Sequence, residues 1–219
     1  MSYKEEQRSA IDAAAGAPQE GDTAGEAQGA ASDPALPHDD ADDDTLLARI
    51  AGGEQAAFRA LMARHYRRVF TLVYRMIPNR DDAEDLAQDI FFTVWVKRAD
   101  WKPGEATFTT WLYRVTVNRC IDFKRKRKPE GSDEVPDVAD DRPDAAALVH
   151  QRQTTEILRQ ATLKLSDEQQ AVLALFYQQG LSNAEAAEVL GTSVSAVESL
   201  LKRARKRLRE ILRKRSKDL

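Results

Sequence analysis

This chain of 219 residues contains a single cysteine and no long apolar run, and both absences exclude classes of protein. Cys120 can form no disulfide within the chain and has no second thiol with which to bind zinc. No apolar stretch approaches the ~20 residues that cross a bilayer, and the N-terminus has neither the basic start nor the apolar centre of a signal peptide. We therefore expect a cytoplasmic protein without membrane insertion, in which Cys120 is a small buried apolar residue.

The residues that catalysis requires are also scarce. The three histidines, His38, His65 and His150, are scattered, and no nucleophile, metal-binding cluster or glycine-rich phosphate loop accompanies them. The acidic residues between Asp81 and Asp89 could hold magnesium in principle, but helical spacing distributes them around the axis. We expect no catalytic residue, metal, cofactor or small-molecule substrate, and keep a helical nucleic-acid hydrolase as an alternative.

Negative charge is concentrated in two segments. Residues 1–44 carry twelve acidic and two basic side chains, and residues 129–144 carry seven acidic side chains and one arginine. The rest of the chain has a net charge of +13, which favours a polyanionic partner. Because the acidic segments have few large apolar side chains, burial cannot offset the entropy that ordering would cost. We predict an all-α protein with a disordered acidic extension at 1–44, a flexible acidic linker at 129–145, and small helical domains at 45–128 and 146–219.

The first of these domains is helical by its apolar period. Apolar side chains recur mostly at three- and four-residue steps over residues 47–76. They are Leu47, Ile50, Phe58, Leu61, Met62, Val69, Leu72, Val73 and Met76. The sequence PNRDD at 78–82 then breaks the helix, and Asp81 is expected to cap the next helix, over 82–98.

That next helix has two contrasting faces at ~100° per residue. Leu86, Ile90 and Val94 define its core face. The face almost opposite comprises Asp85, Gln88, Asp89 and Phe92. The Phe92 ring either packs beneath a neighbouring loop or anchors a docking patch with a polar rim, and the pattern does not decide between these interpretations.

Pro103 and Gly104 interrupt the helical pattern. A helix then resumes, with Phe108, Leu112, Val115 and Ile121 inside and with Arg114, Asn118, Arg119 and Asp122 on another face. Trp101 and Trp111 bracket the loop, and the basic run 124–128 ends the helix. Cations beside planar rings suit single-stranded nucleic acid, whereas both tryptophans would serve equally well in a core.

The second domain contains a helix-turn-helix signature. Ser182 is placed to cap a short helix over 183–190, Gly191 supplies a tight turn, and Ser193 is placed to cap the helix that follows. In this last helix the inward stripe is Val194, Val197, Leu201, Ala204 and Leu208, and the opposite side carries Ser195, Ser199, Lys202, Arg203 and Lys206. Hydroxyls allow close approach to base edges and the cations reach phosphates or guanine, so this face is expected to bind duplex DNA. A coiled coil or a plain solvated face is the alternative.

Three sequence motifs, in this order, resemble a known family. They are DAEDLAQDIFFTVW from residue 82, TFTTWLYRVTVNRCIDFKRKRK from residue 107, and LSDEQQAVLALFYQQGLSNAEAAEVLGTSVSAVESLLKRARKRL from residue 165. They are similar to regions 2 and 4 of the extracytoplasmic-function (ECF) group of sigma-70 factors, and the resemblance covers residues 45–212. It implies two helical domains that bind core RNA polymerase, recognise promoter DNA and promote its melting for a signal-responsive set of genes.

The resemblance also implies roles for particular residues. Core-polymerase binding falls to Asp85, Gln88, Asp89 and Phe92, which favours docking for Phe92. Minus-ten recognition falls to Lys102, Pro103, Gly104, Glu105, Ala106, Thr107, Phe108, Trp111, Arg114, Asn118 and Arg119. Minus-thirty-five recognition falls to Ser193, Ser195, Ala196, Glu198, Ser199, Lys202, Arg203 and Lys206. Many relatives carry basic residues where this chain has Glu198 and Leu200, so their base preference does not transfer. The family implies an anti-sigma factor as a further partner.

A stand-alone helix-turn-helix regulator with a helical sensor domain is the main alternative. It would explain the second domain and would bind two half-sites as a dimer. It leaves the loop with its tryptophans and the acidic face around Asp85 unexplained.

The acidic extension lies outside all three motifs. We expect its charge to screen the basic DNA-binding surfaces of the free protein and so to discourage promoter binding without polymerase.

Overall fold

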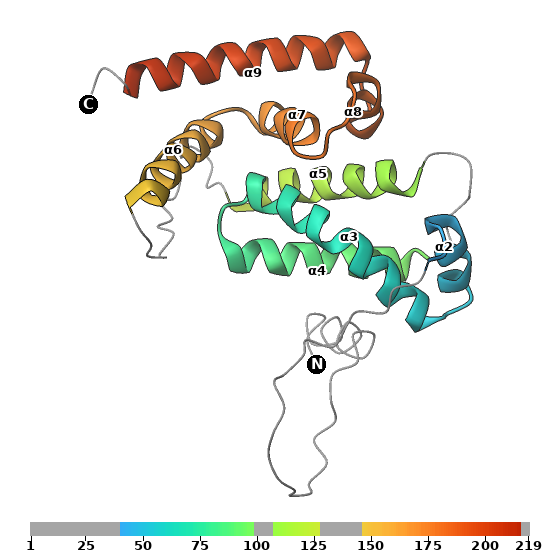
Figure 1. Cartoon of the computed structure of the whole chain (residues 1–219). Helices are drawn as coiled ribbons and strands as arrows, with labels where there is room; N and C mark the ends of the chain where they lie inside the picture. Colours follow the sequence, from blue (N-terminus) through green and yellow to red (C-terminus); the bar gives the residue numbers. More distant parts are fainter. Residues whose placement is uncertain (1–39, 99–106, 128–145, 216–219) are drawn as a thin grey trace, which may run out of the picture. The chain divides into compact units, whose positions relative to one another are not determined.

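The computed structural model describes residues 40–98, 107–127 and 146–215, and all their regular secondary structure is helical (Figure 1). In chain order the helices are α2 (Asp43–Ala51), α3 (Gln55–Met76), α4 (Arg80–Val96), α5 (Phe108–Arg127), α6 (Ala146–Leu163), α7 (Asp167–Tyr177), α8 (Asn183–Leu190) and α9 (Val194–Arg215). The predicted all-α class is therefore confirmed. The predicted linker and most of the predicted extension lie outside the described residues, but the last two residues of that extension, Asp43 and Asp44, form the start of α2.

The chain divides into two compact units that are each built from two stretches of sequence. One unit comprises Met1–Arg67 and Gln88–Phe108, and the other comprises Arg68–Ala87 and Thr109–Leu219. The predicted domains, 45–128 and 146–219, were instead defined by the order of the sequence motifs. Their boundaries stay a prediction.

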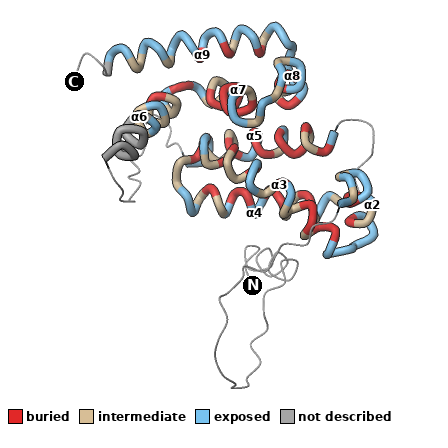
Figure 2. Tube along the Cα trace, in the orientation of Figure 1, coloured by how far each residue is buried: buried red, intermediate tan, exposed pale blue. Residues whose placement is uncertain are grey.

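In the first unit, the described core forms between α2 and the adjoining parts of α3 and α4. Leu46 and Ile50 on α2 are fully buried. Figure 2 colours the described chain by burial, with buried residues in red. Phe58 on α3 is buried as well, and its ring centroid lies 5.1 Å from that of Trp95 on α4. Tyr66 stacks on Phe91 in the same unit, at 6.1 Å between centroids. Aromatic rings therefore hold these segments together, and among them the helical period had placed Phe58 in the core.

In the second unit, α9 packs against α6, α7 and α8. A capping box starts α7, because the Ser166 hydroxyl accepts from the Gln169 backbone and the Gln169 side chain accepts from the Ser166 backbone. The buried Gln170 amide donates to the carbonyls of Leu165 at 2.8 Å and Leu163 at 3.3 Å. These bonds satisfy two carbonyls at and just beyond the end of α6, which would otherwise lack partners.

Several local predictions differ from the structure in detail. Asn79 caps α4 instead of Asp81, since its side chain accepts from the Asp82 backbone N–H at 2.9 Å and the helix begins at Arg80. Met62 is half-buried, although the period placed it in the core. Val115 and Ile121 are also only half-buried, and the interior face of α5 instead includes Leu112, Tyr113, Thr116, Val117 and Cys120.

Cys120 is fully buried, as expected. Burial raises the pKa of its thiol to about 12, because removal from water disfavours the thiolate. None of the described helices has the length and apolar character needed to cross a membrane.

Candidate nucleic-acid interface

Helices α8 and α9 form the predicted helix-turn-helix. The Ser182 hydroxyl accepts from the Glu185 N–H at 3.2 Å, and the Glu185 carboxylate accepts from the Ser182 N–H at 2.8 Å, so α8 starts with a complete capping box. The pKa of the Glu185 carboxyl is lowered because the Ser182 N–H, and second the Ser182 hydroxyl at 2.7 Å, donate to its carboxylate. Gly191 ends α8 in the left-handed conformation, with φ 63° and ψ 38°. Because α9 begins at Val194, the connection between the two helices is a tight turn.

The long helix α9 separates an apolar face from a cationic face. Val197, Leu201 and Ala204 are buried, and Leu208 is half-buried. Val194 was predicted to point inward but is 43% exposed, because it is the first residue of α9 and lies beyond the end of the packed stripe. The inward stripe therefore begins one turn later than the period alone indicated.

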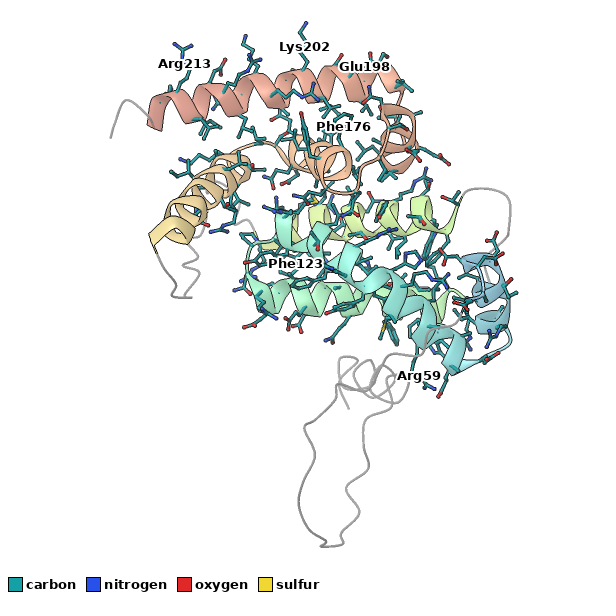
Figure 3. All side chains as sticks on the ribbon, in the orientation of Figure 1. Arg59, Phe123, Phe176, Glu198, Lys202 and Arg213 are labelled. Carbon is teal, nitrogen blue, oxygen red and sulfur yellow. The ribbon has the colours of Figure 1, made fainter. Side chains whose placement is uncertain are left out.

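The outward face of α9 carries the residues predicted to read DNA. Ser195, Glu198, Ser199, Lys202, Arg203 and Lys206 are all exposed, and Ala196 is half-buried. Figure 3 shows Glu198, Lys202 and Arg213 on the side of the helix that is turned away from α7. Ser193 is exposed too, but its hydroxyl accepts from the Ala196 N–H at 3.2 Å and so caps α9.

An open groove of about 390 Å³ adjoins this face. It is lined by Lys164, Ser166, Gln169, Arg203, Lys206, Arg207 and Glu210. Four of these residues are cationic and one is acidic, and Glu210 lies 3.7 Å from Arg207. The groove can therefore attract an anion to the edge of the outward face of α9.

Helix α4 has the two predicted faces. Leu86, Ile90 and Val94 are buried on one face. On the other, Asp85, Gln88 and Asp89 are exposed and Phe92 is half-buried. An apolar ring with one accessible side among polar groups has the composition of a docking anchor, but no contact in the described residues tests that role.

The residues predicted to bind the minus-ten element fall into two groups. Trp101 and the stretch 102–106 lie outside the described residues, so their predicted roles are untested. The described members are Thr107, Arg114, Asn118 and Arg119, which are exposed, Trp111, which is half-buried, and Phe108, which is 2% exposed. The Arg114 guanidinium donates to the backbone carbonyl of Glu188. Phe108 was predicted to lie inside, and its burial leaves little of its ring accessible to a base.

Sequence reasoning missed one buried polar cluster. His65 on α3 is 3% exposed, and its Nε2 atom lies 2.8 Å from Oδ2 of Asp43. Burial would raise the pKa of the Asp43 carboxyl, but the hydrogen bonds and charges of His65 and Arg64 outweigh it and lower that pKa. The signal was present in the sequence, because His65 stands four residues after Leu61 and four before Val69, both of which are core residues.

Comparison with known proteins gives the family. Residues 61–130 match the family model of sigma-70 region 2, and residues 155–208 match that of sigma-70 region 4. The chain is 35% identical over 178 residues to the ECF RNA polymerase sigma factor SigE of Mycolicibacterium smegmatis, with 77% of this chain and 67% of that protein covered. It is 31% identical to the ECF RNA polymerase sigma factor SigW of Bacillus subtilis, with 76% and 95% covered. The chain belongs to the ECF group of the sigma-70 family.

A solved structure agrees with this assignment. The structure of CnrH in complex with the cytosolic domain of CnrY shares 31% sequence identity with this sigma factor and superimposes with a TM-score of 0.58. The match covers 78% of this chain and 96% of that chain. The protein is thus an alternative sigma factor, a DNA-binding factor of transcription initiation. Helices α4 and α5 fall within region 2, and α8 and the part of α9 up to residue 208 fall within region 4.

Proposed function

We propose that this sigma factor binds core RNA polymerase, recognises minus-thirty-five and minus-ten promoter elements, and promotes melting of the start site. The outward face of α9 is the observation that carries the proposal. Ser195 and Ser199 stand on its first two turns, and Lys202, Arg203 and Lys206 follow on the same side. Small hydroxyls let the start of the helix enter a major groove, while the longer cations contact phosphates or guanine.

The groove beside α9 supports duplex binding. Lys164 and Arg207 extend the cationic surface of Arg203 and Lys206 from α9 towards the start of α7. With α9 in the major groove of DNA, the adjacent DNA backbone would meet positive charge on both walls of the protein groove. These contacts add affinity that depends on salt, with little base preference.

Region 2 is assigned the minus-ten element. The set comprises Lys102, Pro103, Gly104, Glu105, Ala106, Thr107, Phe108, Trp111, Arg114, Asn118 and Arg119. Exposed cations on α5 contact backbone phosphates, and a base that leaves the duplex costs a few kcal/mol, which stacking and a pocket can offset. Melting in this scheme is driven by binding, without nucleotide hydrolysis, and we assign no catalytic step to this chain.

We assign polymerase docking to Asp85, Gln88, Asp89 and Phe92 on α4. We also propose an anti-sigma factor as a second protein partner, since the related CnrH was solved in complex with another protein, the cytosolic domain of CnrY. Because bacterial RNA polymerase works in the cytoplasm, we place the protein there.

Run-off transcription tests the proposal. Purified protein is added to core polymerase on a library of genomic promoter fragments, and the transcripts are sequenced. We expect initiation from a small set of fragments that share two spaced elements, and loss of that set with Lys202→Ala/Arg203→Ala. If no fragment is selected above the level of core polymerase alone, the proposed function is wrong.

A further inference from the structure

Asp43, His65 and Phe108 form a chain of contacts within the first compact unit. Oδ2 of Asp43 lies 2.8 Å from Nε2 of His65, and Oδ1 of Asp43 accepts from Nη1 of Arg64 at 2.7 Å. The Phe108 ring meets the same imidazole edge-on, with centroids 5.3 Å apart and an interplanar angle of 72°. Residues from α2, α3 and the start of α5 are therefore joined through one buried ring.

The imidazole is held in one orientation. A carboxylate that accepts from a ring nitrogen fixes both the tautomer and the plane of a histidine. An aliphatic side chain at this position would fill the space between Leu61 and Val69 without any such direction. The edge-to-face contact then couples that orientation to the Phe108 ring, because this is one of the geometries that aromatic pairs prefer over a face-to-face sandwich.

Phe108 occupies a significant place in the sequence. It is the first residue of α5, and Trp111 and Arg114 follow three and six residues later on the same helix. Its own ring is buried, so a direct contact with a base would require the ring to leave the core. Phe108 is nevertheless one of the residues assigned to minus-ten recognition, and it begins α5 directly after the exposed Thr107 of the same assigned set.

We propose that Asp43 and His65 are positioning residues for minus-ten recognition, which they support by fixing the Phe108 ring at the start of α5. The inference rests on the proposed function of region 2. Recognition sites lose much of their effect when a contacting group is displaced by about 1 Å, so a loosened Phe108 weakens promoter contacts even in a folded protein. Asp43 at the start of α2 thus affects DNA binding through His65 and Phe108, without contacting the DNA itself.

The test compares two affinities of the same variants in complex with core polymerase. His65→Phe keeps an aromatic ring and removes the hydrogen bond to Asp43, whereas Phe108→Leu keeps apolar burial and removes the ring contact. Fluorescence anisotropy measures binding of the holoenzyme to a single-stranded minus-ten oligonucleotide, taken from a promoter selected by run-off transcription, and binding of each variant to core polymerase. Glu54→Gln is the control, because it weakens an exposed ion pair with Arg49 in the same unit.

We expect His65→Phe and Phe108→Leu each to weaken oligonucleotide binding by roughly tenfold, with core-polymerase affinity unchanged. The double variant should be no weaker than either single one, because both changes break the same chain of contacts. If His65→Phe binds the oligonucleotide as tightly as the wild type, the inference is wrong and Phe108 acts independently. Should His65→Phe fail to fold, Asp43→Asn takes its place, since it leaves both rings present. A wild-type holoenzyme that cannot distinguish the oligonucleotide from a scrambled one would refute the proposed function instead.

Discussion

The hydroxyl oxygens of Ser193 and Ser195 lie 3.1 Å apart at the start of α9, within hydrogen-bonding distance. Ser193 also accepts from the Ala196 N–H, so its hydroxyl is engaged on both sides. Both serines are expected to contact DNA, but the structure shows a capping hydrogen bond for Ser193 alone of the two. Ser193 starts the helix, and Ser195 stands on its outward face.

This difference predicts opposite outcomes for two alanine substitutions. Ser193→Ala should lower the free energy of unfolding by about 1 kcal/mol, because it removes a helix cap. Ser195→Ala should leave stability nearly unchanged and should weaken binding to a minus-thirty-five duplex by about 1 kcal/mol. Urea unfolding and fluorescence anisotropy measure the two quantities. Equal loss of stability in both variants would contradict the division of tasks.

Arg203 provides a test of base recognition by α9. Arg203→Ala should weaken binding of the minus-thirty-five duplex by ~1–3 kcal/mol if the guanidinium contacts a base, and should relax preference at one position. Arg213→Ala is the matched control, because it removes the same charge from an exposed position further along α9. It should reduce affinity less and leave sequence preference unchanged. The measurement is anisotropy with a set of duplexes that differ at single base pairs.

The docking face of α4 predicts a separation of polymerase binding from folding. Asp85→Ala and Phe92→Ala should each reduce affinity for core polymerase, while helical content and unfolding midpoint stay close to those of the wild type. Asp81→Ala removes an exposed carboxylate from the first turn of the same helix and serves as the control. Normal polymerase binding by the Asp85 and Phe92 variants would show that the face has another role.

The buried thiol of Cys120 predicts very slow alkylation. With its pKa raised to about 12 and no exposed surface, it should resist iodoacetamide near pH 8 in the folded protein. In urea it should react at the rate of a free cysteine. Mass spectrometry of samples taken over time gives both rates, and rapid labelling without denaturant would show that the core around α5 opens readily.

Asp43 predicts a dependence of stability on acid. Because the folded-state pKa of its carboxyl is lowered, the ionised form stabilises the folded protein above the unfolded-state pKa of about 4. That contribution is lost as the pH falls through the lower folded-state pKa. Asp43→Asn should therefore be less stable than the wild type near neutral pH, and the difference should shrink below about pH 4. Urea unfolding at several pH values measures it, and a constant difference would contradict the assignment.

The sequence predicted best where local chemistry decides the structure. Ser182 and Gly191 mark the ends of α8 by side-chain capping and by a conformation that favours glycine, so the helix-turn-helix was visible without tertiary information. Asn79 and Asp81 are both good capping residues two positions apart, and only the path of the chain selects Asn79. The period of an amphipathic helix shows which side faces the core but not where the core ends, which is why Val194 was misplaced.

Polar residues in the core were the hardest to predict. His65 stood at a core position of α3, but from the sequence it was noted only as one of three scattered histidines, and its partner Asp43 was not predicted. Its partner Asp43 belongs to the stretch 1–44, which was expected to be disordered because of its acidic composition. The pair was therefore not predicted from the sequence. Contacts between residues more than twenty positions apart leave no local trace in one sequence.

The capping of α2 defines how the acidic extension can be removed. Asp42 accepts from the Thr45 N–H at 2.7 Å, and the carbonyl of Ala41 accepts from Arg64. A chain cut after residue 40 retains both anchors, whereas a cut only four residues later would remove Asp43 and loosen His65. Electrostatic shielding by the extension can be tested by titrating free protein that lacks residues 1–40 with promoter DNA at several salt concentrations. The result reports on charge alone only if the truncation ends at residue 40 and leaves the start of α2 intact.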